Sequence, residues 1–193
     1  MSLFADTDDW SGTATAQSAL GLVMRRKRRY AEGVALYDSA IALFLRLGDR
    51  KSHTAMLDGR ADLVAQMGDP RSAFPDAAEA VRRAAQTQDP FLLHRAQRTL
   101  GRVYTGLGRY DEALESLRDS VTGFEAMGRP LSLAATLRDL ALLFRRQRRR
   151  DDARRTLLAE RDCLRGAGVV DLSEVDQLLA ELDDAEVHRG AVG

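Results

Sequence analysis

The chain has 193 residues with 29 basic and 29 acidic side chains, so its formal net charge is zero and favours neither nucleic acid nor a membrane surface as partner. No apolar run approaches the roughly 20 residues that cross a bilayer. The single cysteine, Cys163, excludes a disulfide within the chain, and the first residues are acidic where a signal peptide would be basic. We therefore expect a cytoplasmic, folded protein.

The first expected element is an acidic N-terminal segment over residues 1–12. Two interpretations of it stay open: Phe4 and Trp10 cover the open end of the first helix pair, or the segment is a frayed tail. Amphipathic helices are then expected in pairs. The first pair is expected at 13–27 and 31–47, and the second at 51–67 and from about residue 70. The third pair is expected from residue 90 and at 110–127, and the fourth at 130–147 and 150–166.

Glycines and prolines mark the ends of these helices. A glycine in the left-handed conformation commonly ends a helix, and five glycines stand where such an end is expected: Gly48, Gly68, Gly108, Gly128 and Gly168. Pro70, Pro90 and Pro130 are expected at first helical positions. Pro75 would break an interior hydrogen bond if its helix began at Pro70, so we expect Ser72 to be the cap, or a kink at Pro75.

The last helix is expected over residues 173–188, followed by a short tail at 189–193. One face of it is apolar, and the other carries six carboxylates. The apolar residues are Val175, Leu178, Leu179 and Leu182, and the acidic ones are Glu174, Asp176, Glu181, Asp183, Asp184 and Glu186. Such a helix, apolar inward and polar outward, is typical of the cap that closes a repeat array.

A pattern recurs every 40 residues and divides the chain into the repeats 13–52, 53–92, 93–132 and 133–172. The first and third repeats align without a gap, with identities that include Leu20 and Leu100, Gly21 and Gly101, Arg29 and Arg109, and Tyr30 and Tyr110. Two columns hold only small residues: Gly21, Ala61, Gly101, Ala141, and Gly33, Ala73, Ala113, Ala153. Small residues let two helix axes approach closely, so each column predicts a helix crossing.

The residues Leu100, Gly101, Tyr104, Ala113 and Leu117 resemble the tetratricopeptide repeat (TPR) pattern, in a 40-residue form similar to the repeats of kinesin light chain and of bacterial regulators. The resemblance implies an all-α, right-handed α-solenoid of four TPR-like helix pairs plus a C-terminal capping helix. Arg60, in place of a leucine, and Glu160, in place of a small residue, depart from the pattern. The second and fourth repeats are therefore expected to pack less regularly.

The sequence holds no motif for catalysis, for a metal or for a cofactor, and we expect no enzyme activity. His53, His94 and His188 are dispersed, and a pair of histidines without a third ligand is a poor metal site. Cys163 is interpreted as a half-buried structural thiol.

In TPR proteins the first helix of each pair lines the concave face, and here that face is rich in arginine. The candidate ligand-binding residues are Arg25, Arg95, Arg98, Arg102, Arg138 and Arg145.

The expected function is a protein–protein interaction scaffold, regulatory or assembly-related, that binds an acidic peptide or protein segment through these arginines. A second interpretation stays open, in which Asp58, Asp62 and Asp139 on neighbouring helices already pair with them. The alternative function is a component of a nucleic-acid-associated transcriptional regulator, through basic clusters at residues 25–29 and 145–155. The acidic last helix could occupy the arginine-rich groove of its own or a neighbouring chain, which would give self-association.

Overall fold

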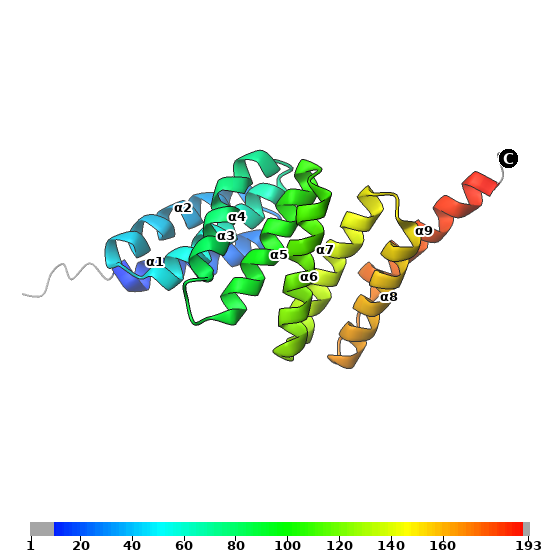
Figure 1. Ribbon diagram of the computed structural model, residues 1–193. Helices are drawn as coiled ribbons and strands as arrows, with labels where there is room; N and C mark the ends of the chain where they lie inside the picture. The colour runs from blue at the N-terminus through cyan, green and yellow to red at the C-terminus, as the bar shows by residue number, and fades with distance from the viewer. Residues whose placement is uncertain (1–9, 191–193) are drawn as a thin grey trace, which may run out of the picture. The chain divides into compact units, whose positions relative to one another are not determined.

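The computed structural model describes the backbone of residues 10–190 and the side chains of residues 10–182. The interpretations of residues 1–9 and 191–193, and of the last acidic side chains, lie outside this range. The described residues form α-helices joined by short turns and no strand (Figure 1). The helices are α1 Trp10–Arg26, α2 Tyr30–Leu47, α3 Arg50–Gln66, α4 Pro70–Ala84, α5 Pro90–Leu107, α6 Tyr110–Ala126, α7 Pro130–Arg146, α8 Arg150–Gly166 and α9 Ser173–Gly190.

The chain divides into two compact units, which are described separately: an N-terminal unit up to Asp89, with α1 to α4, and a C-terminal unit from Pro90, with α5 to α9. Within each unit, most packing joins helices that follow one another in the chain, and α5 also packs on α7. We call α1, α3, α5 and α7 first helices and α2, α4, α6 and α8 second helices. The predicted all-α fold of helix pairs followed by a C-terminal helix is confirmed. The repeat boundaries themselves stay a prediction.

In the N-terminal unit, glycines make room for large side chains at the helix crossings. The fully buried Tyr37 ring lies against Gly21, where a Cβ atom would stand 2.9 Å from the ring. A Cβ on Gly33 would stand 2.6 Å from the Leu63 Cδ1 atom. The small-residue columns therefore mark close helix contacts, as the sequence predicts.

The core of the C-terminal unit runs through α6, α7 and α8 and ends on α9. Leu117, Leu143, Leu157 and Val175 are almost completely buried in one cluster. Leu179 and Leu182 of α9 belong to the same cluster. The apolar face of α9 thus covers the last helix pair, which is the role that the sequence predicts for it.

The predicted left-handed glycines are confirmed, with φ between +60° at Gly128 and +87° at Gly68. Two arginines, Arg28 with φ +57° and Arg148 with φ +60°, stand at the equivalent turns. An arginine in this conformation carries a steric cost that a glycine avoids.

The predicted Ser72 cap of α4 is wrong, whereas Pro70 is the first residue of the helix, as predicted. The cap is Asp69, whose side chain accepts a hydrogen bond from the Ser72 backbone N at 3.0 Å, and the helix begins at Pro70. Pro75 therefore lies inside α4. An aspartate followed by proline is a strong start signal because it supplies both the cap and a preset φ, and here it outweighs the hydrogen bond lost at Pro75.

None of the helices in the described part of the chain is long and apolar enough to span a membrane.

Candidate binding surface of the first helices

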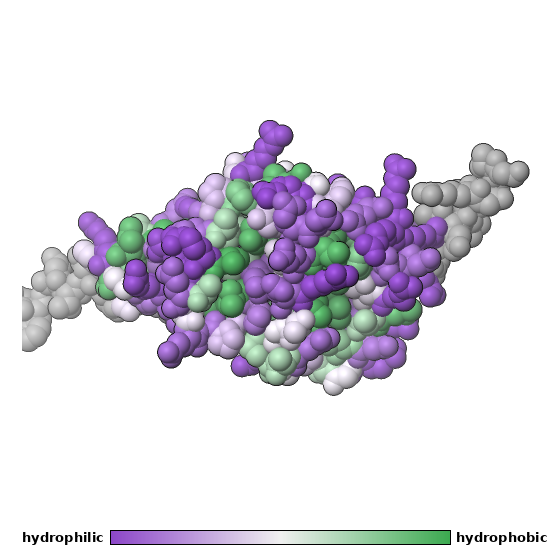
Figure 2. Space-filling model, viewed as in Figure 1, coloured by the Kyte–Doolittle hydropathy of each residue, from purple (hydrophilic) through white to green (hydrophobic). Residues whose placement is uncertain are grey.

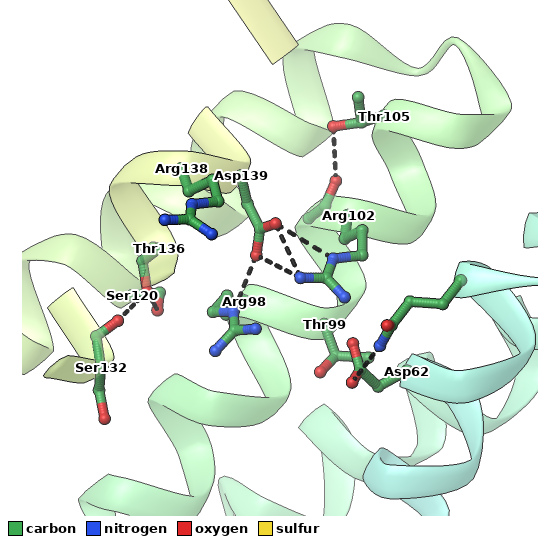
Figure 3. Close-up of polar contacts among 12 residues, drawn as sticks. Asp62, Arg98, Thr99, Arg102, Thr105, Ser120, Ser132, Thr136, Arg138 and Asp139 are labelled. Carbon is green, nitrogen blue, oxygen red and sulfur yellow. Dashed lines mark hydrogen bonds and ion pairs between the residues drawn. The ribbon is translucent and has the colours of Figure 1, made fainter. Parts of the chain in front are cut away.

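Arg98 and Arg102 of α5 converge on one carboxylate, that of Asp139 on α7 (Figure 3). Arg98 Nε lies 2.8 Å from Oδ2, and Arg102 Nη2 lies 2.8 Å from Oδ1 and 3.1 Å from Oδ2. The two arginines are one turn apart on one helix face, so their charges repel unless an anion lies between them. Asp139 is buried and supplies that anion, while the arginine side chains stay 20% and 21% exposed.

Arg138 of α7 bridges two glutamates. Its Nε lies 2.7 Å from Oε1 of Glu160 on α8, and its Nη1 donates to Oε2 of Glu174 on α9. Glu160 is 1% exposed, and burial raises the pKa of its carboxyl although Arg138 partly opposes the effect. Its Oε2 atom is buried without a hydrogen-bond partner among the described residues. Arg138 thus supplies the positive charge that partners the buried carboxyl of Glu160, the residue that departs from the repeat pattern.

The acidic side of α9 faces basic side chains of α7 and α8. Arg145 Nη2 lies 3.3 Å from Oε2 of Glu181, and Arg161 Nη1 lies 3.6 Å from Oδ1 of Asp176. Two of the candidate arginines, Arg138 and Arg145, therefore each have a partner on the last helix of their own chain. The idea that α9 associates with a neighbouring chain stays a prediction.

In the N-terminal unit, Arg25 of α1 donates from Nη1 to Oδ2 of Asp62 on α3 at 2.9 Å. Asp62 also accepts from Gln66 Nε2 at 2.8 Å. Arg60, the other departure from the pattern, binds Asp76 through Nε and Nη2 at 2.6 and 2.9 Å. It also reaches Asp38 of α2, and the Asp76 carboxylate raises the pKa of Arg60. The missing leucine is thus replaced by an ion-pair network.

The structure therefore brings Arg98 and Arg102 together, and places Arg138 and Arg145 on α7 and the half-buried Arg95 on α5. The sequence suggested Asp62 and Asp139 as internal partners. It also suggested that the acidic last helix lies against the arginines of its own or a neighbouring chain, and the contacts of Glu174 and Glu181 are of the first kind. It missed Glu160 as a partner of Arg138. The individual pairs could have been found from the separation of 36 residues from Arg138 to Glu174 and from Arg145 to Glu181, close to the 37 from Arg25 to Asp62.

The histidines and the cysteine that the sequence singled out and whose side chains are described make contacts within the fold. His53 is buried beside Arg83, and burial, aided by that charge, lowers its pKa. His94 Nδ1 lies 2.8 Å from Gln97 Oε1. Cys163 is half-buried, donates to the Pro130 carbonyl, and has its pKa raised by burial. The side chains described here include no group of three or more His, Cys, Asp or Glu that could hold a metal ion.

Residues 92–162 match the family model of the tetratricopeptide repeat. This segment covers nearly all of α5 to α8. It carries the Leu-Gly, Tyr and Ala positions on which the resemblance rests. The segment is therefore made of tetratricopeptide repeats, and the predicted resemblance is confirmed there.

Solved structures with the same fold extend the likeness over most of the chain. A Podosopora anserina protein with nearly identical TPR-like repeats of the kinesin light chain type superposes with a TM-score of 0.68 at 19% identity, covering 96% of this chain and 92% of that one. The apo form of RapI gives 0.65 at 11% identity, covering 93% and 50%. Aspartyl phosphate phosphatase F from Bacillus subtilis gives 0.67 at 13% identity, covering 93% and 49%.

These identities show the fold alone, an α-solenoid of TPR-like helix pairs. The chain spans about half the length of RapI and of the phosphatase. No curated protein matches the chain in sequence.

Proposed function

We propose that this protein is a protein–protein interaction scaffold that binds an acidic peptide or protein segment on the arginine-rich face of α5 and α7, the first helices of its C-terminal unit. Solenoids of helix pairs present extended surfaces to their partners, and their fold leaves the identity of the partner open. Hydrophilic side chains cover much of the molecular face drawn in Figure 2, with apolar side chains between them.

The observation that carries the proposal is the way Arg98 meets Asp139. Arg102 binds both carboxylate oxygens of Asp139, and Arg98 shares the same carboxylate. Arg98 uses only its Nε atom toward Asp139. Its remaining guanidinium donors have the planar geometry that binds a carboxylate through two hydrogen bonds. An acidic side chain of a ligand could accept hydrogen bonds from these donors of Arg98.

Arg138 and Arg145 extend this surface along α7 with pairs that a ligand can exchange. Glu174 is 77% exposed and Glu181 45% exposed, and pairs of this kind contribute about 0–1 kcal/mol each. Replacing Glu174 or Glu181 by a carboxylate of the ligand therefore costs little free energy. We infer that these two arginines supply secondary contacts, while Arg98 and Arg102 supply the main one.

The proposal is tested by fluorescence anisotropy with a labelled peptide rich in Asp and Glu, against the same peptide with Asn and Gln in their place. The acidic peptide should bind, and added salt should weaken it. Arg98→Glu/Arg102→Glu should lower the affinity at least about tenfold, since a hydrogen bond to a charged group is worth roughly 1.5–3 kcal/mol.

The matched control makes the same charge change on second helices, Arg118→Glu/Arg154→Glu, at two exposed arginines of the C-terminal unit. It should leave the affinity unchanged, and all variants must show equal helical circular dichroism. Equal affinity for the acidic and the neutral peptide, or equal loss in both double variants, would contradict the proposed site. Affinity capture from lysate with the same pair of variants then identifies the natural partner.

A further inference from the structure

A small cavity lies where the start of α3 meets the end of α4 in the N-terminal unit. Its volume is about 150 Å³, so it holds a group larger than one water molecule, whose share of liquid volume is about 30 Å³. No acid is among the described residues that line it. The lining consists of three arginines and three neutral polar residues: Arg50, Thr54, Arg82, Arg83, Gln86 and Thr87. We call this space the α3–α4 cavity.

The two threonines of the α3–α4 cavity hold its backbone in place. Thr54 is buried, and its Oγ1 donates to the Arg50 carbonyl at 2.7 Å. Thr87 Oγ1 donates to the Ala84 carbonyl at 2.7 Å and accepts from the Asp89 backbone N at 3.3 Å. The walls are thus fixed by hydrogen bonds within the fold before a ligand binds, and the arginines supply the donors for the ligand.

Arg82 and Arg83 are oriented by Glu79, while part of each guanidinium group keeps its donors. Arg82 uses Nε and Nη2 toward the Glu79 carboxylate, and Arg83 uses Nε toward it. Arg83 Nη1 also lies 3.2 Å from Nδ1 of the buried His53, whose pKa burial lowers, so this ring adds no positive charge at neutral pH. No partner for Arg82 Nη1 or Arg83 Nη2 is found within residues 10–182.

Arg50 brings a further positive charge to the α3–α4 cavity. It is the first residue of α3, its side chain is exposed, and within residues 10–182 no partner of its guanidinium group is found. The acid next to it, Asp49, caps α3 by accepting from the Ser52 backbone N at 2.9 Å. The Asp89 carboxylate lies 2.8 Å from Lys51 Nζ. The guanidinium group of Arg50 is therefore ready to bind an anion.

We propose that the α3–α4 cavity binds a phosphate monoester. Such a group carries close to two negative charges at neutral pH and presents three acceptor oxygens, whereas a carboxylate has one charge and two oxygens. The planar fork of a guanidinium group binds these oxygens in pairs. Arg50 and the remaining donors of Arg82 and Arg83 thus match the oxygens of a phosphate, and the exposed Gln86 adds a neutral amide donor.

The inference goes beyond the function proposed above, because all the residues of this cavity belong to the N-terminal unit and none lies on α5 or α7. The ligand is also of another chemical class, a phosphate in place of a carboxylate. The two proposals can therefore fail independently.

The test is isothermal titration calorimetry of the full chain, in a buffer without phosphate, with a peptide of neutral residues around one phosphoserine. This phosphopeptide should bind, and the same peptide with serine should not. Arg50→Gln should weaken binding at least about tenfold, because it removes a charged donor. The matched control is Arg71→Gln, at an exposed arginine near the other end of α4, which should leave the affinity unchanged.

Gln86→Glu is the second variant, and it should weaken binding by placing a negative charge in the lining. Circular dichroism confirms that each variant folds. Binding of the serine peptide as tight as that of the phosphopeptide, or equal affinities of Arg50→Gln and Arg71→Gln, would overturn the proposal. So would a greater loss in Arg98→Glu/Arg102→Glu than in Arg50→Gln, because it would assign the phosphate to α5.

Inorganic phosphate distinguishes the two sources of such a group. Displacement of the phosphopeptide by phosphate at a similar concentration supports a small phosphate compound as the ligand. Displacement only at a concentration at least about tenfold higher supports a phosphorylated protein, whose peptide chain adds contacts. Failure of phosphate to displace the phosphopeptide at any concentration would overturn the proposal, because the phosphate group would then not be what the cavity recognises.

Discussion

Arg102 binds both carboxylate oxygens of Asp139 across 37 residues of sequence, and the same separation joins Arg25 to Asp62 in the N-terminal unit. In each case an arginine of one first helix reaches an acid of the next first helix in its unit. The arginines proposed to bind a ligand are thus also the groups that tie neighbouring repeats together. Stability and binding are therefore expected to respond in opposite directions when the shared acid is removed.

Asp139→Asn should destabilise the protein and strengthen acidic-peptide binding. The change removes the anion that two guanidinium groups share, each of them about one-fifth exposed. Loss of one partner from a fully buried pair costs about 3–5 kcal/mol, so this partly exposed cluster should lose about 2 kcal/mol in urea denaturation. Asp176→Asn, at an exposed pair with Arg161, should change stability by less than about 1 kcal/mol. Weaker peptide binding by a folded Asp139→Asn variant would contradict competition between the two anions.

Arg148→Gly should raise the free energy of unfolding by about 0.5–1 kcal/mol. Arg148 has φ +60°, where an L side chain is strained, and the equivalent turn of the preceding pair holds Gly108. Arg150→Gly is the control: this residue begins α8 in a helical conformation, so glycine there should be neutral or destabilising. Thermal denaturation of both variants measures the difference. A stability loss in Arg148→Gly would mean that contacts of the arginine outweigh its backbone strain.

Gly101→Ala should destabilise the C-terminal unit by about 1–3 kcal/mol, because the new Cβ would lie 2.6 Å from Leu117 Cγ in a closely packed crossing. Gly166→Ala makes the same chemical change at the end of α8, where no atom lies within 4 Å of the new Cβ. That variant should be neutral or more stable by up to about 1 kcal/mol, since alanine favours helix. Chemical denaturation compares them, and equal effects would show that the crossing can adjust.

The stability of the wild type relative to Glu160→Gln should fall as the pH rises. Burial raises the folded-state pKa of Glu160, so the folded protein holds this proton more tightly than the unfolded chain does. The stabilising contribution is therefore complete below the unfolded pKa of about 4.3, and it is lost as the pH rises through the folded pKa. Urea denaturation from pH 4 upward measures the difference. A wild type that gains on the variant with rising pH would show that the Arg138 pairing outweighs burial.

The fold could be predicted because local signals repeat. Gly48, Gly128 and Gly168 mark the turn after a second helix, and Gly68 and Gly108 mark the turn after a first helix, so these turns follow from the sequence alone. The columns of small residues mark the helix crossings in the same way. The apolar face of α9 likewise predicted its packing. Where two local signals competed, the prediction failed: at α4 the Asp69-Pro70 start prevailed over the hydrogen bond lost at Pro75.

The partners of the candidate arginines were harder to predict because they depend on the separation of helices in space. Asp139 was recognised because it lies on a first helix with the right spacing. Glu160 was interpreted only as a departure from the repeat pattern. In the structure it is buried and accepts a hydrogen bond from Arg138, so each of the two residues is the charged partner of the other. The left-handed conformation of Arg28 and Arg148 was also missed, since the sequence offers no glycine there.

The order in which helices pack also bears on how the protein responds to mechanical force. In the C-terminal unit α9 packs on α8, and α8 packs on α7, so each helix is held chiefly by its neighbour in the chain. A pull on the end of α9 would detach that helix first, with the Glu174 and Glu181 contacts, and leave Asp139 on α7 in place. Detachment would expose Arg138 and Arg145 without disturbing Arg98 and Arg102. Tension on the C-terminal helix would thus enlarge the basic surface in steps.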